Sequence, residues 1–350
     1  MLSLCMIVKN EEDIIEKCLE AVKNFVDEII IVDTGSLDST KKVCLKYTEK
    51  IYDFTWIDDF AAARNFSISK TSNDWILVLD ADEEVTHFNI KEIIKFINNE
   101  KNNELVGRIK RTNFMDDIKG IKIYMERANR LFNKNYFCYN GTIHEQVVSK
   151  NGNNYCTDLV DICVEHEGYL KNNMIRKGKL NRNIDLLNKA IENDPQDPYL
   201  FYQLGKSYYM IKDFEKACSC FKNSLSYKLD YKLEYVEDLV ETYGYSLIED
   251  ERYDTALQIK DYFDYYKNSP DFLFLMGIIH MNNAMFSQAI DYFDKCTNYE
   301  IGKVKGITTF LPYYNIGVIN EVLGYTKNAI KYYKLCGNYE NAISRLKIIE

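Results

Sequence analysis

The sequence lacks the features that mark several common classes of protein. It has no Cys-X-X-Cys pair among its 10 cysteines and no N-terminal leader with charged, apolar and cleavage regions, which predicts a location in the reducing cytoplasm. The apolar stretch 2–8 ends at Lys9, far short of the roughly 20 residues that cross a bilayer, so no transmembrane segment is expected. A formal net charge of -9 argues against general binding to nucleic acid or to anionic membranes.

What the sequence does contain is enough apolar material for two domains. The 350 residues are 46% hydrophobic and 28% charged, a balance typical of a globular protein. Near residue 170 the pattern changes from mixed strands and helices to helices alone, and Pro195 and Pro198 lie just before the first repeated segment. We therefore predict one domain over residues 1–185 and a second over residues 186–350.

The first domain alternates strands with helices. Three continuous apolar runs are expected to be strands buried on both faces of a sheet, over residues 2–8, 28–33 and 75–80. Between them, one helix is predicted after a cap at Asn10 and another over residues 59–70. This alternation predicts an α/β domain with a mostly parallel sheet. From about residue 105 to residue 148, strand-like stretches without a full helix predict an antiparallel edge or flap.

The second domain repeats itself. Four segments contain a Gly followed by an Ala twelve positions later: Gly205 and Ala217, Gly244 and Ala256, Gly277 and Ala289, and Gly317 and Ala329. Aromatic residues flank the Ala, except that the second segment has Lys260 at the later aromatic position and the fourth has Thr326 at the earlier one. The pattern resembles the tetratricopeptide repeat, in which small residues let paired helices pack closely. An all-α repeat domain is therefore expected.

An acidic turn follows the third apolar strand. Asp80 and Asp82 stand one residue apart there, and such a pair suits a hard divalent cation that also binds phosphate oxygens. A structural alternative is that the acids only cap and charge the following helix or turn. Asp33 ends a neighbouring strand, where it could also serve simply as a turn cap for Thr34 or Gly35. Because ligands bind beyond the carboxyl ends of parallel strands, these acids are expected to share one site.

Four stretches of the first domain together resemble the family-2 glycosyltransferases of GT-A fold. They are Cys5 to Glu12, Val32 to Thr40, Phe60 to Asn65 and Leu79 to Glu84. The resemblance spans roughly residues 3 to 170, and it includes the branch of the family that carries tetratricopeptide repeats, such as the sublancin-type peptide S-glycosyltransferases. It implies a GT-A domain with a mostly parallel sheet and an antiparallel flap, followed by a tetratricopeptide-repeat domain.

The resemblance also implies how a nucleotide-sugar donor is bound. Asp33 would hydrogen-bond the base, usually uracil, next to the turn at Gly35. Lys9 and Asn10 would shape the nucleotide pocket, although a helix cap explains Asn10 almost as well. The donor expected from these matches is a UDP-sugar.

Metal and phosphate binding are implied for the next two stretches. Asp80 would lie near the ribose and the metal, and Asp82 would ligate Mg²⁺ or Mn²⁺ that bridges the diphosphate. Arg64 would help to hold the donor, with a surface ion pair to Asp58 or Asp59 as its structural alternative.

Candidates for the remaining roles lie further along the chain. Glu145 and the adjacent His144 could deprotonate the acceptor, and because adjacent side chains of a strand point to opposite faces, only one of them should face the sugar. Enzymes of the fold that this sequence resembles commonly place an acidic base here, so the resemblance favours Glu145. His144 could instead be structural. His166 resembles a further metal ligand of GT-A enzymes, although an ordinary core or surface histidine would fit as well. Arg127 and Arg130 could meet phosphate or acceptor, but surface pairing is the simpler expectation.

Together these features imply an inverting, metal-assisted transfer of a sugar from a UDP-sugar to a Cys, Ser or Thr side chain of a peptide or protein. The repeats would recruit that acceptor, because repeat arrays form long concave surfaces. Two alternatives stay open: a lipid-linked or cell-envelope saccharide as the acceptor, and a non-catalytic repeat scaffold. The repeats could also form a homodimer.

Overall fold

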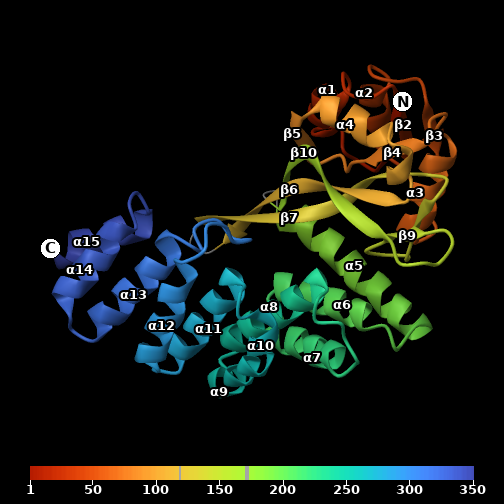
Figure 1. Cartoon of the computed structure of the whole chain (residues 1–350). Helices are drawn as coiled ribbons and strands as arrows, with labels where there is room; N and C mark the ends of the chain where they lie inside the picture. Colours follow the sequence, from red (N-terminus) through yellow and green to blue (C-terminus); the bar gives the residue numbers. More distant parts are fainter. Residues whose placement is uncertain (118–119, 170–172) are drawn as a thin grey trace. The chain divides into compact units, whose positions relative to one another are not determined.

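The computed structural model describes residues 1–117, 120–169 and 173–350. The chain divides into two compact units, Met1–Arg176 and Lys177–Glu350 (Figure 1). The predicted domain boundary at residues 185/186 falls inside the helix α5 (Asn173–Asn193). Among the described residues, no helix is both long enough and apolar enough to cross a membrane.

An eight-stranded sheet forms the centre of the first unit, in the order β3-β2-β1-β4-β7-β6-β10-β5. Its strands are β1 (Leu2–Val8), β2 (Glu28–Asp33), β3 (Ile51–Asp53), β4 (Trp75–Val78), β5 (Glu83–Phe88), β6 (Leu105–Asp117), β7 (Gly120–Asn133) and β10 (Cys156–Tyr169). The first four strands in the order pair in parallel, whereas β7 pairs antiparallel with β4 and β6, and β10 pairs parallel with β6 and antiparallel with β5. The predicted fold, a mostly parallel sheet with antiparallel strands, is confirmed.

Two details of that prediction differ from the structure. The long strands β6 and β7 belong to the main sheet, while β8 (Phe137–Asn140) and β9 (Gln146–Ser149) form a separate two-stranded sheet. The acidic turn is followed by strand β5 and not by a helix. The turn therefore joins two strands of the same sheet, and β5 is held at the sheet edge by β10.

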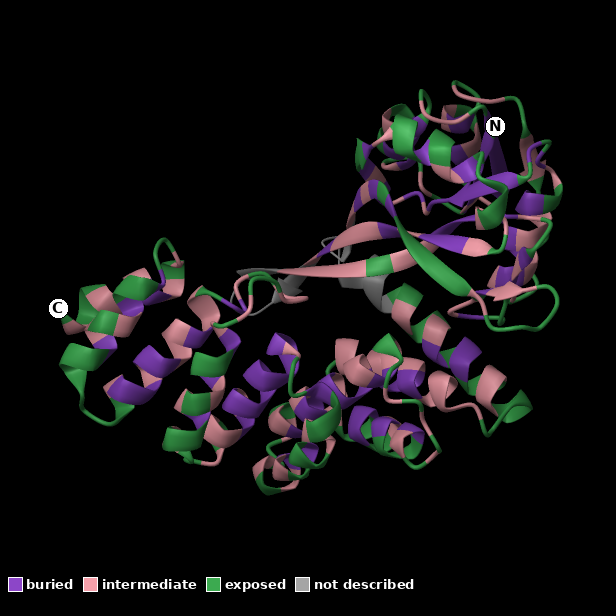
Figure 2. Cartoon of the chain, viewed as in Figure 1, coloured by how far each residue is buried: buried purple, intermediate pink, exposed green. Residues whose placement is uncertain are grey.

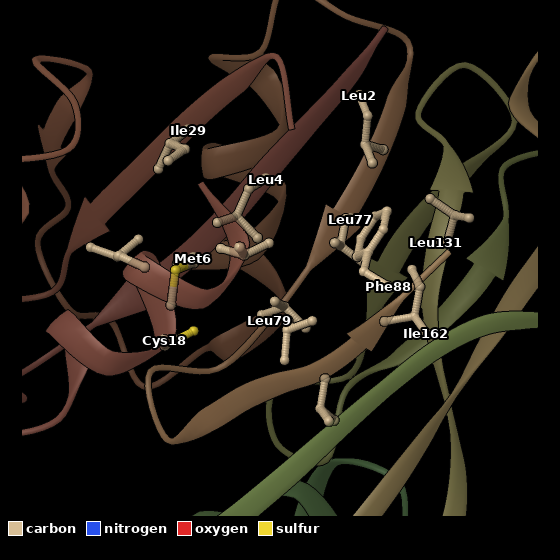
Figure 3. Close-up of a cluster of buried hydrophobic side chains, with 14 of the residues drawn as sticks. Leu2, Leu4, Met6, Cys18, Ile29, Leu77, Leu79, Phe88, Leu131 and Ile162 are labelled. Carbon is tan, nitrogen blue, oxygen red and sulfur yellow. The ribbon is translucent and has the colours of Figure 1, made fainter. Parts of the chain in front are cut away.

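Alternating residues of the strands fill two cores, one on each face of the sheet. Leu4 and Met6 of β1 pack on one face with helix α1 (Ile15–Val22) and helix α4 (Ile90–Ile97), as Figure 3 shows for Leu4, Met6 and Cys18. Cys5 points to the other face, which α3 (Phe60–Ser69) and the β8–β9 sheet cover. Figure 2 shows buried positions along strands of this unit. Both faces are covered, which explains the continuous apolar runs.

The helix starts were only partly predicted. Helix α1 begins at Ile15 after Ile14, with no side-chain cap, so the predicted cap at Asn10 is wrong. Helix α3 begins one residue later than predicted, because Asp59 is its cap and accepts a hydrogen bond from the Ala62 amide at 2.8 Å. Two short helices complete this unit: α2 (Thr40–Cys44) and the 3-10 turn η1 (Glu100–Asn102).

The described elements of the second unit are helices joined by turns and loops. After α5 come α6 (Pro198–Met210), α7 (Phe214–Leu225), α8 (Glu234–Glu249), α9 (Tyr253–Ala256), η2 (Leu257–Tyr262), α10 (Phe263–Tyr266), α11 (Pro270–Asn282), α12 (Phe286–Cys296), α13 (Phe310–Val322), α14 (Thr326–Leu335) and α15 (Glu340–Ile349). The predicted all-α repeat architecture is confirmed, because α6 packs on α7, α11 on α12 and α13 on α14.

The repeated glycines mark the closest approach of paired helices. A Cβ added at Gly277 would lie 2.5 Å from a ring carbon of Phe293, so only glycine fits there. Gly205 and Gly317 face aromatic rings in the same way. The second repeat differs, since Gly244 packs on Leu275 of α11 and the partner segment breaks into α9, η2 and α10. Lys260, which replaces the aromatic residue, lies in this broken segment.

Glu28, the first residue of β2, binds side-chain and backbone groups from three other segments of the chain. Its carboxylate accepts hydrogen bonds from Ser3 Oγ at 2.5 Å, Lys50 Nζ at 2.5 Å and the Ser72 amide at 2.9 Å. Burial opposes its ionisation, but these hydrogen bonds outweigh burial and lower the Glu28 pKa to about 2. Glu28 thus favours the folded state whenever its carboxylate is charged.

We expect the variant Glu28→Gln to be less stable at neutral pH by about 1–3 kcal/mol, because the hydrogen bonds to a carboxylate are charge-assisted. The folded pKa lies below the unfolded value of about 4.3, so the difference from wild type should be complete above that pH and disappear as pH falls towards 2. Denaturant unfolding at several pH values measures it. The exposed variant Glu20→Gln is the control, and a difference that persists at pH 2 would contradict the assignment.

Candidate functional site

Three predicted segments meet at the carboxyl edge of the parallel strands. Lys9 and Asn10 follow β1, Asp33 ends β2, and Asp80 follows β4. The register confirms this neighbourhood, since Val8 lies opposite Asp33 and Cys5 lies opposite Val78. Because β2, β1 and β4 are parallel neighbours in the sheet, their carboxyl ends bring these residues together, as the sequence predicts.

The first part of the site is a polar turn beside β1 and β2. Asp33 Oδ2 accepts hydrogen bonds from the amides of Gly35 at 3.1 Å and Ser36 at 3.0 Å. Gly35 has a φ of +101°, which favours glycine at this turn. Asn10 clamps the turn, because its amide donates to Ser36 Oγ and its Oδ1 accepts from the Leu37 amide at 2.8 Å. Asn10 is thus a turn clamp, while Lys9 is exposed beside it.

One carboxylate oxygen of Asp33 takes no part in the turn. Its side chain is buried, and its Oδ1 has no hydrogen-bond partner among the described residues. A buried carboxylate oxygen is ordinarily paired, so this atom fits a ligand that brings an N–H donor. The turn-cap alternative accounts for Oδ2 alone, and the predicted contact of Asp33 with a nucleotide base stays a prediction.

Asp80 is held between two arginines. Its Oδ1 accepts a hydrogen bond from Arg64 Nη2 at 2.8 Å, and its Oδ2 accepts one from Arg130 Nη2 at 2.6 Å. Burial opposes ionisation of Asp80, but the guanidinium groups of Arg130 and Arg64 outweigh it and hold the carboxyl pKa well below its usual range. Asp80 is therefore charged and engaged on both oxygens, which favours a role in orienting the arginines. Its predicted role as a metal ligand stays a prediction.

Arg64 does not pair at the surface. Its side chain is buried, Asp59 is the cap of α3, and the guanidinium Nε donates to a carboxylate oxygen of Glu145. The alternative of a surface ion pair with Asp58 or Asp59 is therefore wrong. Arg64 instead connects Asp80 with Glu145, two residues that the sequence predicted separately.

Glu145 and His144 lie in the loop between β8 and β9, where Gly141 and His144 both have positive φ. The Phe60 amide donates a hydrogen bond to the Thr142 carbonyl at 2.9 Å and fixes this loop to the start of α3. The strand-based argument that only one of the two residues faces the sugar does not apply to a loop. Glu145 contacts Arg64, and the choice of catalytic base stays a prediction.

Sequence reasoning missed the most deeply buried acid of the site. Glu83 is fully buried, and its Oε1 accepts hydrogen bonds from Arg130 Nη2 at 2.7 Å and Arg111 Nη1 at 2.9 Å. Its Oε2 accepts one from the Asp80 amide at 3.0 Å. Glu83 therefore fixes both the backbone and the side-chain partner of Asp80. Its position just after the acidic pair was the only signal in the sequence.

Arg130 reaches this site through a β-bulge. Gly107 of β6 lies opposite Leu131 of β7, whereas Arg108 lies opposite Asn129, so Arg130 is an extra residue in the ladder between them. The bulge leaves Arg130 buried beside Asp80 and Glu83. The expectation of a surface-paired Arg130 is therefore wrong, because a bulge breaks the two-residue period on which facing is predicted.

Asp82 lies beside His166, and the predicted role of the two as metal ligands stays a prediction. Asp82 Oδ2 and His166 Nε2 are 3.4 Å apart, and His166 Nδ1 lies 2.8 Å from Asn113 Oδ1. Asn113 donates its own N–H to Glu126 Oε1 at 2.7 Å, so its Oδ1 is the acceptor and His166 Nδ1 is the donor. In the neutral imidazole this tautomer carries its lone pair on Nε2, the atom that lies towards Asp82, and the hydrogen bond at Nδ1 orients the ring.

Asp82 and His166 fit a divalent metal ion that is also coordinated by a bound diphosphate. No group of three or more His, Cys, Asp or Glu suited to a metal occurs among the residues that the structure describes. Asp82 and His166 alone would be an incomplete cage, but Mg²⁺ and Mn²⁺ commonly take few protein ligands and complete their shell with phosphate oxygens and water. The pair is therefore compatible with a metal that arrives with a diphosphate.

The two sides of the site are joined by one continuous polar network. From Glu145 it passes through Arg64, Asp80, Arg130, Glu83, Arg111, Glu126, Asn113 and His166 to Asp82. The network crosses α3, the acidic turn, β5, β6, β7 and β10. The candidate base and the candidate metal ligands therefore belong to one interconnected set of side chains.

Parts of the chain match known protein families. Residues 3–150 match the model of glycosyl transferase family 2, and residues 186–219 and 312–342 match tetratricopeptide repeat models. A TPR repeat-containing protein of Synechococcus elongatus is 31% identical over 211 residues, which are 58% of this chain and 51% of that protein. The glycosyltransferase SunS of Bacillus subtilis is 28% identical over 232 residues, 63% of this chain and 52% of that protein.

The chain spans about half the length of the curated relatives it matches. Among solved structures, YrrB, described as a TPR protein with an unusual peptide-binding site, is 19% identical with a TM-score of 0.40 over 50% of this chain and 87% of that one. MamA is equally similar, with a TM-score of 0.40 over 49% of this chain and 94% of that one. Residues 3–150 therefore match glycosyl transferase family 2, and residues 186–219 and 312–342 of the helical unit match tetratricopeptide repeats.

Proposed function

We propose that the chain is an inverting glycosyltransferase that moves a sugar from a UDP-sugar to a Cys, Ser or Thr side chain of a peptide or protein, with Mg²⁺ or Mn²⁺. The observation that carries the proposal is the polar network from Glu145 to Asp82 at the carboxyl edge of the sheet. It lies within a family-2 domain, which supports glycosyl transfer as the chemistry.

Donor binding would use the acidic turn and the turn beside β2. Asp33 Oδ1, which is buried without a partner among the described residues, would accept the N–H of the uracil base. Asp82 and His166 would hold the metal, whose charge offsets the negative charge on the diphosphate leaving group. Arg64, kept in place by Asp80, would contact the same diphosphate.

Acceptor activation would fall to Glu145. A carboxylate that reaches the attacking hydroxyl or thiol can take its proton, and in an inverting transfer the attack comes from the side of the sugar opposite the leaving group. A Cys thiol would need less help, since it is the better nucleophile. The repeats would recruit the acceptor, because solenoids of paired helices offer extended surfaces to peptides. A cytoplasmic location and a homodimer stay predictions.

The test is donor turnover by the full chain. We expect UDP release from at least one member of a UDP-sugar panel with Mn²⁺ or Mg²⁺, little release after chelation, and little from GDP-sugars, because Asp33 would read the base. Mass spectrometry of peptides incubated with the active donor would identify the acceptor residue. Turnover of GDP-sugars equal to that of UDP-sugars would overturn the base assignment, and full activity after chelation would overturn the metal assignment.

A further inference from the structure

Three buried donor groups surround Asp80 and Glu145 without an acceptor. Arg64 Nη1, Arg130 Nε and the Tyr139 hydroxyl have no hydrogen-bond partner among the described residues, although their side chains belong to residues that are 7%, 7% and 5% exposed. Buried polar atoms are ordinarily paired, and leaving one unpaired is costly. Three such donors in one cluster indicate that a ligand rich in acceptor oxygens completes it.

Tyr139 belongs to this cluster through Arg64. The Arg64 guanidinium carbon lies 5.4 Å from the centre of the Tyr139 ring. Asn65, the next residue of α3, fixes β8 by donating to the Tyr139 carbonyl at 2.8 Å and by accepting from the Tyr139 amide at 2.9 Å. Helix α3 therefore presents Arg64 and positions Tyr139 at the same time. Neither the sequence pattern nor the donor-binding roles above include Tyr139.

Arg64 holds two carboxylates that differ in how firmly they are fixed. Asp80 is bound on its other oxygen by Arg130, and its amide is held by Glu83. Glu145 is carried by the loop between β8 and β9, in which Gly141 has a φ of +100°. An anion that arrives at Arg64 would therefore displace Glu145 more readily than Asp80.

We propose that Arg64 Nη1 and the Tyr139 hydroxyl bind an anionic oxygen of the donor diphosphate, and that this anion competes with Glu145, which is held at Nε of the same guanidinium, as the ion partner of Arg64. The inference rests on the proposed function for the identity of the donor. Its consequence is an order of events: Glu145 is held by the guanidinium in the absence of donor and is released to serve the acceptor once the diphosphate has bound. A guanidinium suits this exchange, since it binds carboxylates and phosphates in the same fork geometry.

The test compares the affinity of inorganic pyrophosphate and of UDP for the full chain by isothermal titration calorimetry at fixed Mg²⁺. Glu145→Gln keeps the shape of the side chain but removes its charge. We therefore expect both ligands to bind this variant about tenfold more tightly than they bind wild type. The matched control is Glu92→Gln, which removes one negative charge from the exposed face of α4. Tyr139→Phe should lower the affinity for both ligands about three- to tenfold, with an unchanged circular dichroism spectrum.

A double-mutant cycle separates exchange at Arg64 from simple repulsion between Glu145 and the ligand. In the Arg64→Lys background the gain from Glu145→Gln should shrink to about twofold or less, because Lys lacks the fork that holds both anions. Equal or weaker pyrophosphate binding by Glu145→Gln, or a gain that persists in full in the Arg64→Lys background, would overturn the inference. Tighter pyrophosphate binding without any UDP binding would uphold the anion subsite and reject UDP as the donor nucleotide.

Discussion

Replacing Glu83 with alanine is expected to lower the free energy of unfolding of the first unit by about 3–5 kcal/mol, because it leaves two buried guanidinium groups without their shared carboxylate. Glu83 is fully buried and accepts hydrogen bonds from Arg130, Arg111 and the Asp80 amide. Tryptophan fluorescence during denaturant unfolding reports this unit selectively, since both tryptophans, Trp56 and Trp75, lie in it.

The neighbouring residue provides a matched control. Glu84 is partly exposed and pairs with Lys17 at 2.6 Å on the surface, so Glu84→Ala should cost at most about 1 kcal/mol. Equal losses in the two variants would show that the buried network does not depend on Glu83. Glu83→Gln should fall between them, because it retains one acceptor oxygen for the arginines but not the charge.

The parts of this site that could be predicted are those that depend on strand order. Asp33 and Asp80 come at the ends of continuous apolar runs, and parallel strands bring such ends to one edge. Asp82 and His166 meet because β10 pairs with β5, which places His166 opposite Glu83, one residue from Asp82. That contact required the family resemblance, since strand β10 is remote in the sequence and its antiparallel pairing with β5 has no local signal.

The inward position of Arg130 and the partners of Arg64 could not be predicted from the sequence, for a physical reason. Facing along a strand is predicted from a period of two, and the bulge at Arg130 shifts that period by one residue. For Arg64, the two acids before α3 left a surface ion pair open beside the donor-binding role that the resemblance implies, yet Asp59 is used as the helix cap. In both cases a detail of the backbone decides which side chain points inward. The buried carboxylate of Glu83 then pairs with the positive charge of Arg130.

The repeat domain shows the opposite case, in which a local signal was sufficient. Gly205, Gly277 and Gly317 each face an aromatic ring at a distance that excludes a Cβ, so the spacing of Gly and aromatic residues encodes helix pairing directly. The repeat that departs from the spacing at Lys260 is also the one whose second helix is broken. The absence of an aromatic residue there removes the side chain that would fill the seam.

The second large effect is expected for Asp82→Asn, which should reduce donor turnover about a thousandfold while leaving the fold intact. An amide is a much weaker ligand for a hard divalent cation than a carboxylate. The Asp82 side chain is 20% exposed at the rim of the network, so its loss should not disturb the buried pairs at Asp80 and Glu83. Steady-state UDP release measures the turnover, and circular dichroism checks the fold.

A second Asp–His pair, between β5 and β10, supplies the control. Asp161 Oδ1 and His87 Nε2 are 3.1 Å apart on β10 and β5, and both side chains are about half exposed. Asp161→Asn makes the same chemical change away from the acidic turn, so it should leave turnover within about twofold of wild type. Mn²⁺ titration in the presence of UDP, followed by electron paramagnetic resonance, then distinguishes the cause: Asp82→Asn should weaken Mn²⁺ binding and Asp161→Asn should not. Lost turnover with unchanged Mn²⁺ affinity would assign Asp82 to the sugar instead of the metal.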